Sequence, residues 1–179
     1  MAVPSFVCAP LNAGHRLDHF SCGSPEYDEW LITKARGAHE ARTSRVFVLV
    51  RPEAPEHVLA YFTLTNNTVY KQDIPRLFAK GAGGASKMPG ILLGRLARDD
   101  SARGILPLIM LAAFERAVLA ADSSAARFLT IDAASEDLAQ RYEDYGFSRA
   151  KIKEERATIP LIRFIKDIVA EMEAGAAND

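Results

Sequence analysis

The fold is decided by the stretch Ile91–Phe147, which reads ILLGRLARDDSARGILPLIMLAAFERAVLAADSSAARFLTIDAASEDLAQRYEDYGF. Its apolar start predicts a buried strand, and the polar segment 98–104 predicts a loop. A long helix from Pro107, a second strand and a second helix follow. A loop that runs from a buried strand into a helix N-terminus brings backbone N–H groups and the helix dipole to one place, where an anion such as a pyrophosphate can bind. We therefore expect the functional site on this loop.

Length and composition are those of an ordinary globular protein. The chain has 179 residues, of which 49% are hydrophobic and 25% charged, and this is enough for one domain with its own core over residues 1–179. The segment Met1–Ser5 lacks the basic and apolar parts of a signal peptide, and no later run is long enough to span a membrane. These features predict a cytoplasmic protein without a membrane partner.

The net charge and the spacing of cysteine and histidine give no support for binding nucleic acid through the overall charge or for a metal site. The net charge is −1, so the field of the whole molecule gives no argument for a nucleic-acid partner, and an RNA site would be a local patch. The two cysteines, Cys8 and Cys22, have neither a metal-binding spacing nor a disulfide framework, and the histidines are scattered. We predict reduced structural thiols and no metal.

The chain before the decisive stretch predicts a helix and a strand pair. Ser24 can cap a helix that has Pro25 in its first turn. Val46–Val50 and Val58–Thr65 are rich in β-branched and aromatic residues and flank a proline-containing polar loop, which indicates an antiparallel hairpin. A hairpin followed by strand–helix–strand units predicts an α/β or α+β fold, with a mixed sheet flanked by helices.

Polar features between the hairpin and the central strand indicate breaks. Asn66-Asn67 predicts a bulge or a turn, and Asp73 predicts the cap of a short helix. The glycine-rich segment 81–87 precedes a strand and lacks the Gly-Lys-Ser/Thr ending of a nucleotide-binding P-loop, so we interpret it as a mobile flap beside the substrate cleft. The last strand is expected at Ile159–Ile165.

The order of these segments resembles the Gcn5-related N-acetyltransferase (GNAT) superfamily. The resemblance rests on Leu93–Ala97, on the Arg103-Gly104 loop before the long helix, and on the ending Tyr142–Phe147. Phe20–Pro25, followed by Trp30-Leu31, makes the chain most similar to the bacterial toxin–antitoxin acetyltransferases that modify aminoacyl-tRNA. The likeness covers about residues 17–166. It implies a single GNAT-like domain with a mostly antiparallel sheet, whose central strand splays from its neighbour to admit acetyl-CoA.

Tyr142 is the candidate catalytic residue. It shares a helical face with Leu138 and Tyr145, so packing against the core is the alternative interpretation. The resemblance implies that Tyr142 protonates the departing thiolate of coenzyme A, whereas Tyr145 is assigned to packing. A phenol with a pKa of ~10 is protonated at neutral pH and can donate to a thiolate whose pKa is ~8.5.

The cofactor site is assigned mainly by the resemblance. It implies an oxyanion donor in the backbone of Leu96 or Ala97 and a pyrophosphate loop that begins at Arg103. Leu106 and Leu108 replace the two glycines of the family pattern, and Pro107 removes one N–H donor. The predicted acetyl-CoA contacts are Leu96, Ala97, Arg98, Arg103, Gly104, Ile105 and Leu106.

Three functions stay open on these residues. The first is acetylation of the amino acid on charged tRNA by a toxin that inhibits translation, with tRNA contacts at Arg36, Arg42, Arg45 and Arg95, a small DNA-binding antitoxin as partner, and a homodimer. The second is a pseudo-acetyltransferase that binds a protein or RNA, which the replaced glycines favour. The third is acetylation of a small amine or a protein lysine. No general base is identified.

Overall fold

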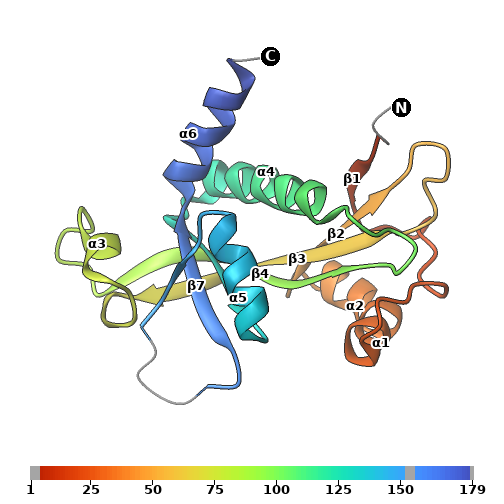
Figure 1. Cartoon of the computed structure of the whole chain (residues 1–179), viewed down its shortest axis with the longest axis horizontal. Helices are drawn as coiled ribbons and strands as arrows, with labels where there is room; N and C mark the ends of the chain where they lie inside the picture. Colours follow the sequence, from red (N-terminus) through yellow and green to blue (C-terminus); the bar gives the residue numbers. More distant parts are fainter. Residues whose placement is uncertain (1–4, 152–155, 178–179) are drawn as a thin grey trace. The chain divides into compact units, whose positions relative to one another are not determined.

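The computed structural model describes residues 5–151 and 156–177, and its sheet has the strand order β1-β2-β3-β4-β5-β7-β6 (Figure 1). The pairs β1–β2, β2–β3, β5–β7 and β6–β7 are antiparallel, whereas β4 and β5 are parallel. The elements are β1 (Val7–Pro10), α1 (Pro25–Thr33), α2 (Ala35–Glu40), β2 (Arg45–Val50), β3 (Ala60–Tyr70), the 3-10 turn η1 (Lys71–Asp73), α3 (Arg76–Ala79), β4 (Lys87–Arg98), α4 (Leu106–Ser124), β5 (Phe128–Ala133), α5 (Glu136–Asp144), β6 (Ser148–Arg149), β7 (Ile159–Phe164) and α6 (Ile165–Ala176). This mixed, mostly antiparallel sheet with helices confirms the predicted fold class.

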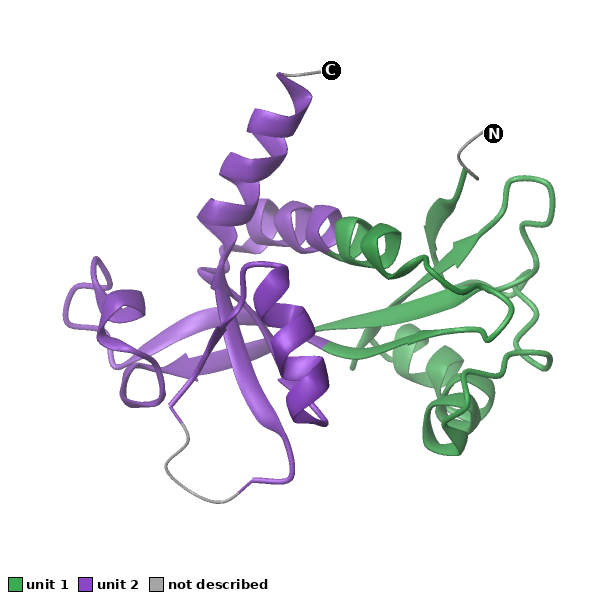
Figure 2. Ribbon diagram, in the orientation of Figure 1, with its two compact units in different colours: residues 1–65, 94–113 green, residues 66–93, 114–179 purple. Residues whose placement is uncertain are grey.

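The contacts divide the chain into two compact units, which Figure 2 shows in different colours. Unit 1 contains residues 1–65 and 94–113, and unit 2 contains residues 66–93 and 114–179. Two strands and one helix, β3, β4 and α4, run from one unit into the other. The prediction that all residues form one domain, and the predicted splay of β4 from β5, stay predictions.

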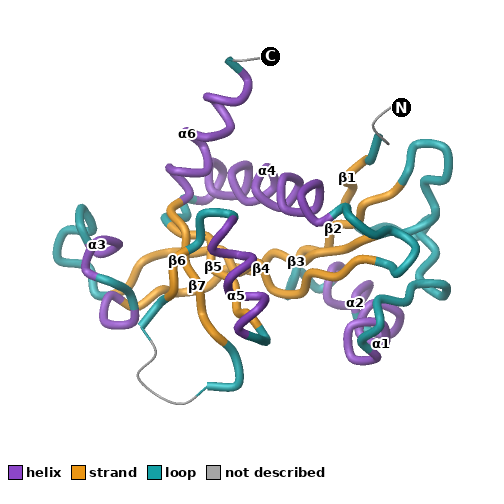
Figure 3. The backbone as a smooth tube through the Cα atoms, viewed as in Figure 1, coloured by secondary structure: helices purple, strands orange, loops and turns teal. Residues whose placement is uncertain are grey.

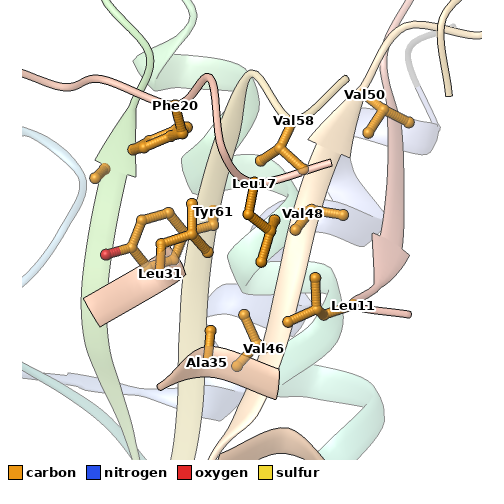
Figure 4. Packing of buried hydrophobic residues seen from close by; sticks show 11 residues of the cluster. Leu11, Leu17, Phe20, Leu31, Ala35, Val46, Val48, Val50, Val58 and Tyr61 are labelled. Atoms are coloured by element: carbon orange, nitrogen blue, oxygen red, sulfur yellow. The ribbon is translucent and has the colours of Figure 1, made fainter. Parts of the chain in front are cut away.

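The core of unit 1 lies between its two short helices and the hairpin β2–β3 (Figure 4). Leu31 of α1 and Ala35 of α2 are fully buried, as are Val46, Val48 and Tyr61 of the strands. Every second residue of a strand points to the same face, so Val46 and Val48 lie together beneath the helices. Burial of a side chain of this size stabilises the fold by about 1.5–3 kcal/mol.

Unit 2 has an aromatic cluster on one face of its sheet. The ring of Phe164 lies 4.7 Å from that of Phe78 and 5.2 Å from that of Phe128, measured between centroids. Residues of opposite parity, such as Leu129 and Leu161, are also buried, and α5 packs against both β5 and β7. The sheet of unit 2 is therefore covered on both faces, as its apolar runs predict.

The strand and helix boundaries confirm several predictions and overturn two. The hairpin is antiparallel, although its second strand starts at Ala60. Of the bulge or turn predicted at Asn66-Asn67, the turn is wrong, because β3 is continuous to Tyr70 and the Asn67 amide nitrogen donates a hydrogen bond to the Thr130 hydroxyl at 2.8 Å. Asp73 does not cap α3, since the residue in that position is Pro75.

Neither a membrane span nor a metal cluster is found in the part of the chain that the structure describes. None of its helices combines the length and apolar character needed to cross a bilayer. Within residues 5–151 and 156–177, no group of three or more His, Cys, Asp or Glu side chains is arranged to hold a metal ion. Cys8 and Cys22 do not form a disulfide, and burial, followed by the nearby Asp28, raises the pKa of the Cys22 thiol to about 11.

Candidate active site

A buried carboxylate organises the loop after β4. Asp99 is 9% exposed, and its two oxygens accept hydrogen bonds from Ser21 N at 2.9 Å, Ser101 N at 2.9 Å and Ser101 Oγ at 2.5 Å. The N–H of Asp99 also donates to the Leu59 carbonyl at 2.8 Å. The end of β4 is thereby tied to two other segments of unit 1, and this fixes the start of the loop.

Asp99 is expected to stabilise the fold in a pH-dependent way. Burial acts to raise its pKa, but the hydrogen bonds from Ser101 and Ser21 outweigh burial and hold the pKa below the ordinary value. A carboxyl group with a lowered folded-state pKa stabilises the fold above its unfolded pKa of ~3.9, and this contribution is lost as the pH falls through the folded value. We expect Asp99→Asn to lower the free energy of unfolding by about 1–3 kcal/mol at pH 7 and by less at pH 3. Urea unfolding of both proteins at the two pH values measures this, and an equal difference at both contradicts it.

The predicted phosphate loop leaves room for an anion. Arg103 and Gly104 are exposed, Ile105 is buried, and α4 begins at Leu106. Gly104 has a φ of +81°, and no atom lies within 4 Å of the position that a Cβ would take there. The Ile105 carbonyl accepts the helical hydrogen bond of the Ile109 N–H at 3.0 Å. The loop thus combines an exposed guanidinium, a helix N-terminus and open backbone, which suits a phosphate group.

The other residues predicted to contact acetyl-CoA differ in how accessible they are to a ligand. Ala97 is buried in the core of unit 1, and Leu96 is half-buried beside it on β4. Arg98 donates a hydrogen bond to the Asp99 carbonyl at 3.2 Å and lies 3.9 Å from the Asp100 carboxylate. Such exposed ion pairs are weak, so a phosphate can compete for Arg98. Half-buried leucines at 106 and 108 stand where the family pattern has glycine.

Tyr142 lies in the last turn of α5, in unit 2. The Ser135 hydroxyl accepts a hydrogen bond from the Leu138 N–H at 3.3 Å, and Gly146 has a φ of +81°, which confirms both predicted ends of this helix. The Phe147 N–H donates to the Tyr142 carbonyl at 3.2 Å, and the Gly146 N–H donates to Glu143 at 2.9 Å. These two bonds form a Schellman motif. Tyr142 is 7% exposed, with its ring centroid 6.3 Å from that of Phe147.

The four arginines predicted to contact tRNA all belong to unit 1, but they have different surroundings. Arg36 donates to the backbone carbonyl of Asn12 at 2.5 Å and to that of His15, so its guanidinium holds the N-terminal segment in place. The Arg95 guanidinium lies over the Trp30 ring, 4.4 Å from its centroid. Arg42, which follows α2, and Arg45, the first residue of β2, are exposed.

Comparison with known proteins adds to this geometry. No family model matches the chain. A "tRNA-acetylating toxin" of Mycobacterium tuberculosis is 30% identical to this chain over 130 residues, which are 72% of this chain and 75% of that protein. The chain belongs to the GNAT toxins of toxin–antitoxin systems.

Solved structures of GNAT toxins have the same fold. AtaT in complex with acetyl-methionyl-tRNAfMet superimposes with a TM-score of 0.83 at 23% identity, over 94% of this chain and 99% of that one. A mutant of AtaT bound to acetyl-CoA and to the C-terminus of the antitoxin AtaR gives a TM-score of 0.76 at 22% identity, over 93% of this chain and 98% of that one. At sequence identities of 22–23%, this structural likeness shows the fold alone.

The sequence did not predict that Arg163 of this GNAT toxin supports the helix of Tyr142. Arg163 of β7 is 3% exposed, donates to the Tyr145 carbonyl at 2.6 Å and forms an ion pair with Glu171. Its guanidinium also lies 4.9 Å from the centroid of the Phe114 ring. The available signal was an arginine within the apolar run Ile159–Ile165, since a charge in such a strand must be paired when it is buried.

Proposed function

We propose that this protein transfers the acetyl group of acetyl-CoA to the α-amino group of the amino acid on charged tRNA. The observation that carries the proposal is the likeness to a tRNA-acetylating toxin over 72% of the chain. An N-acetylated aminoacyl-tRNA has no free amine to form a peptide bond, so the product blocks translation. The reaction would take place in the cytoplasm, where charged tRNA is found.

The proposed reaction needs an attacking amine, an oxyanion donor and an acid. The neutral amine attacks the thioester carbonyl carbon, and the backbone N–H of Leu96 or Ala97 stabilises the tetrahedral oxyanion. Collapse of this intermediate breaks the C–S bond and releases the thiolate. The Tyr142 hydroxyl gives its proton to the sulfur, and the proton lost by the amine restores the phenol through solvent. No side chain is assigned as the general base.

Arg103 is expected to bind the pyrophosphate of acetyl-CoA. Loss of a charged hydrogen bond to phosphate should weaken binding by about 10–100-fold in Arg103→Gln, because such bonds contribute about 1.5–3 kcal/mol. Isothermal titration of the full chain with acetyl-CoA measures this. Arg51→Gln, at an exposed arginine of the same unit, is the control and should bind like the unmodified protein. Equal affinities of all three proteins would remove Arg103 from the site.

A pseudo-acetyltransferase is the second candidate, and one specific observation favours it. Leu106 and Leu108 stand where the family pattern has glycines, and Pro107 between them has no N–H to donate to a phosphate. The same titration separates the candidates, since no binding at about 1 mM acetyl-CoA, a weak affinity for any specific ligand, would leave a binding module without chemistry.

The acceptor is tested by direct acetyl transfer. Radiolabelled acetyl-CoA should label charged tRNA and leave uncharged tRNA, a lysine peptide and a small primary amine unlabelled. Affinity for tRNA should fall steeply with added salt, as contacts with phosphates require. Labelling of the small amine alone would replace the proposed acceptor. We also propose a homodimer and a small DNA-binding antitoxin as partners; AtaT, for comparison, binds the C-terminus of its antitoxin AtaR.

A further inference from the structure

Unit 2 contains a cavity that the reaction described above does not use. It has a volume of about 290 Å³ and is lined by residues of β3, β4, β5 and β7. At ~30 Å³ for each water molecule, this volume holds about ten waters or one amino-acid side chain with its backbone amine. The cavity opens to solvent, since Thr68, Tyr70 and Asp132 of its lining are exposed, so a ligand can enter it.

Strand register places the cavity directly beside the aromatic cluster of unit 2. Leu92 of β4 and Ile162 of β7 both pair with Thr130 of β5, so the three side chains share one face of the sheet. On that face Phe128 and Phe164 belong to the packed cluster, Leu92 and Thr130 line the cavity, and Ile162 belongs to both. The cavity therefore has a largely apolar floor.

The polar groups of the cavity are mainly hydrogen-bond acceptors. The Asp132 carboxylate, at the end of β5, has no hydrogen bond or ion pair with any of the described residues. The Asn67 side-chain oxygen is buried and has no partner among the described residues, while its nitrogen donates to Thr130. Two unpaired acceptors, one of them a carboxylate, suit a ligand that carries an ammonium group.

The position in the fold connects the cavity to the tyrosine helix. Asp132 lies near the carboxyl end of β5, a strand that is parallel to β4, and ligands of parallel sheets bind at the carboxyl ends of the strands. The chain continues from β5 to Ser135, which caps α5, the helix of Tyr142. Both the cavity and this helix belong to unit 2.

We propose that the cavity binds the amino-acid end of the acceptor, with Asp132 holding its ammonium group and the apolar floor receiving its side chain. This inference rests on the proposed function, because it assigns the acceptor of that reaction to a site. The ammonium group loses its proton to solvent before attack, and Asp132 acts by positioning. The size of the floor would then limit which amino acids are accepted.

Amino-acid methyl esters test the cavity without catalysis, since they carry the ammonium group and the ester of an aminoacyl end. Binding of leucine methyl ester to the full chain is measured by isothermal titration. We expect saturable binding that weakens about tenfold or more in Asp132→Asn, as loss of a charged hydrogen bond requires. The control Asp122→Asn, at an exposed aspartate of the same unit, should bind normally. N-acetyl-leucine methyl ester, which has no ammonium group, should not bind.

A second variant tests the floor. Leu92→Phe should weaken binding of leucine methyl ester and leave glycine methyl ester unaffected, because only the larger side chain needs the volume that phenylalanine fills. Equal binding of leucine methyl ester by Asp132→Asn and the unmodified protein, or no saturable binding by the unmodified protein, would overturn the inference. If the ester binds as expected but charged tRNA is not acetylated, the proposed function fails and the cavity remains an ammonium site. If Asp132→Asn acetylates charged tRNA as well as the unmodified protein does, the proposed role of the cavity is wrong and the proposed function stands.

Discussion

Tyr142→Phe is expected to lower kcat for acetylation of charged tRNA by about 10²–10³-fold, the usual effect of removing a general acid. The thiolate then has to take its proton from water. The affinity for acetyl-CoA should stay within about twofold, because the substitution removes only the hydroxyl and no pyrophosphate contact. Initial rates at saturating acetyl-CoA, together with isothermal titration of the cofactor, measure the two quantities separately.

Tyr145→Phe is the matched control, since both tyrosines lie at the end of the same helix. Burial, followed by the nearby Asp144, raises the pKa of Tyr145, so its phenol also stays protonated at neutral pH. Its rate should nevertheless remain within about threefold of the unmodified protein, because Tyr145 is assigned to packing rather than to proton transfer. Equal loss of activity in both variants would show that the helix end, rather than the Tyr142 hydroxyl, is needed. Full activity of Tyr142→Phe would exclude Tyr142 as the acid.

Local signals in the sequence were sufficient for the elements that carry the site. Ser135 and Gly146 mark the two ends of α5 by chemistry that depends only on neighbouring residues, and the structure confirms both. The central strand and the long helix followed from continuous apolar runs (Figure 3). The type of each element was predictable because it depends on the pattern of apolar residues within a short segment of the sequence.

Contacts between distant segments were not predictable in the same way. Asn67 indicated a turn, yet it lies in a strand because Thr130, on another strand, accepts a hydrogen bond from its amide. Arg36 donates to two backbone carbonyls of the N-terminal segment, contacts that the sequence did not predict, while its predicted contact with tRNA stays a prediction. Asp132 was not considered, because only the register of β5 with β4 and β7 brings it to a cavity. Each of these outcomes depends on partners far away in the sequence.

The Schellman motif joins the stability of unit 2 to the position of Tyr142. Gly146 lies in the left-handed region, with a φ of +81°, and the two hydrogen bonds of the motif end on the last turn of α5. The buried Arg163 guanidinium packs against the Cα of Gly146 and donates to the neighbouring carbonyl of Tyr145. A side chain at position 146 therefore meets two obstacles, its backbone conformation and a fixed cation.

Gly146→Ala is expected to lower the free energy of unfolding by about 3 kcal/mol or more, through left-handed strain and overpacking together. A Cβ there would lie 2.9 Å from Arg163 Cζ, and Arg163 cannot move without breaking its hydrogen bond and its ion pair with Glu171. Gly83→Ala is the control, because Gly83 also has a positive φ, of +60°, but has open space around its Cα. It should cost only about 1 kcal/mol. Urea unfolding of both variants separates strain from overlap, and equal losses would mean that Arg163 yields to the added methyl group.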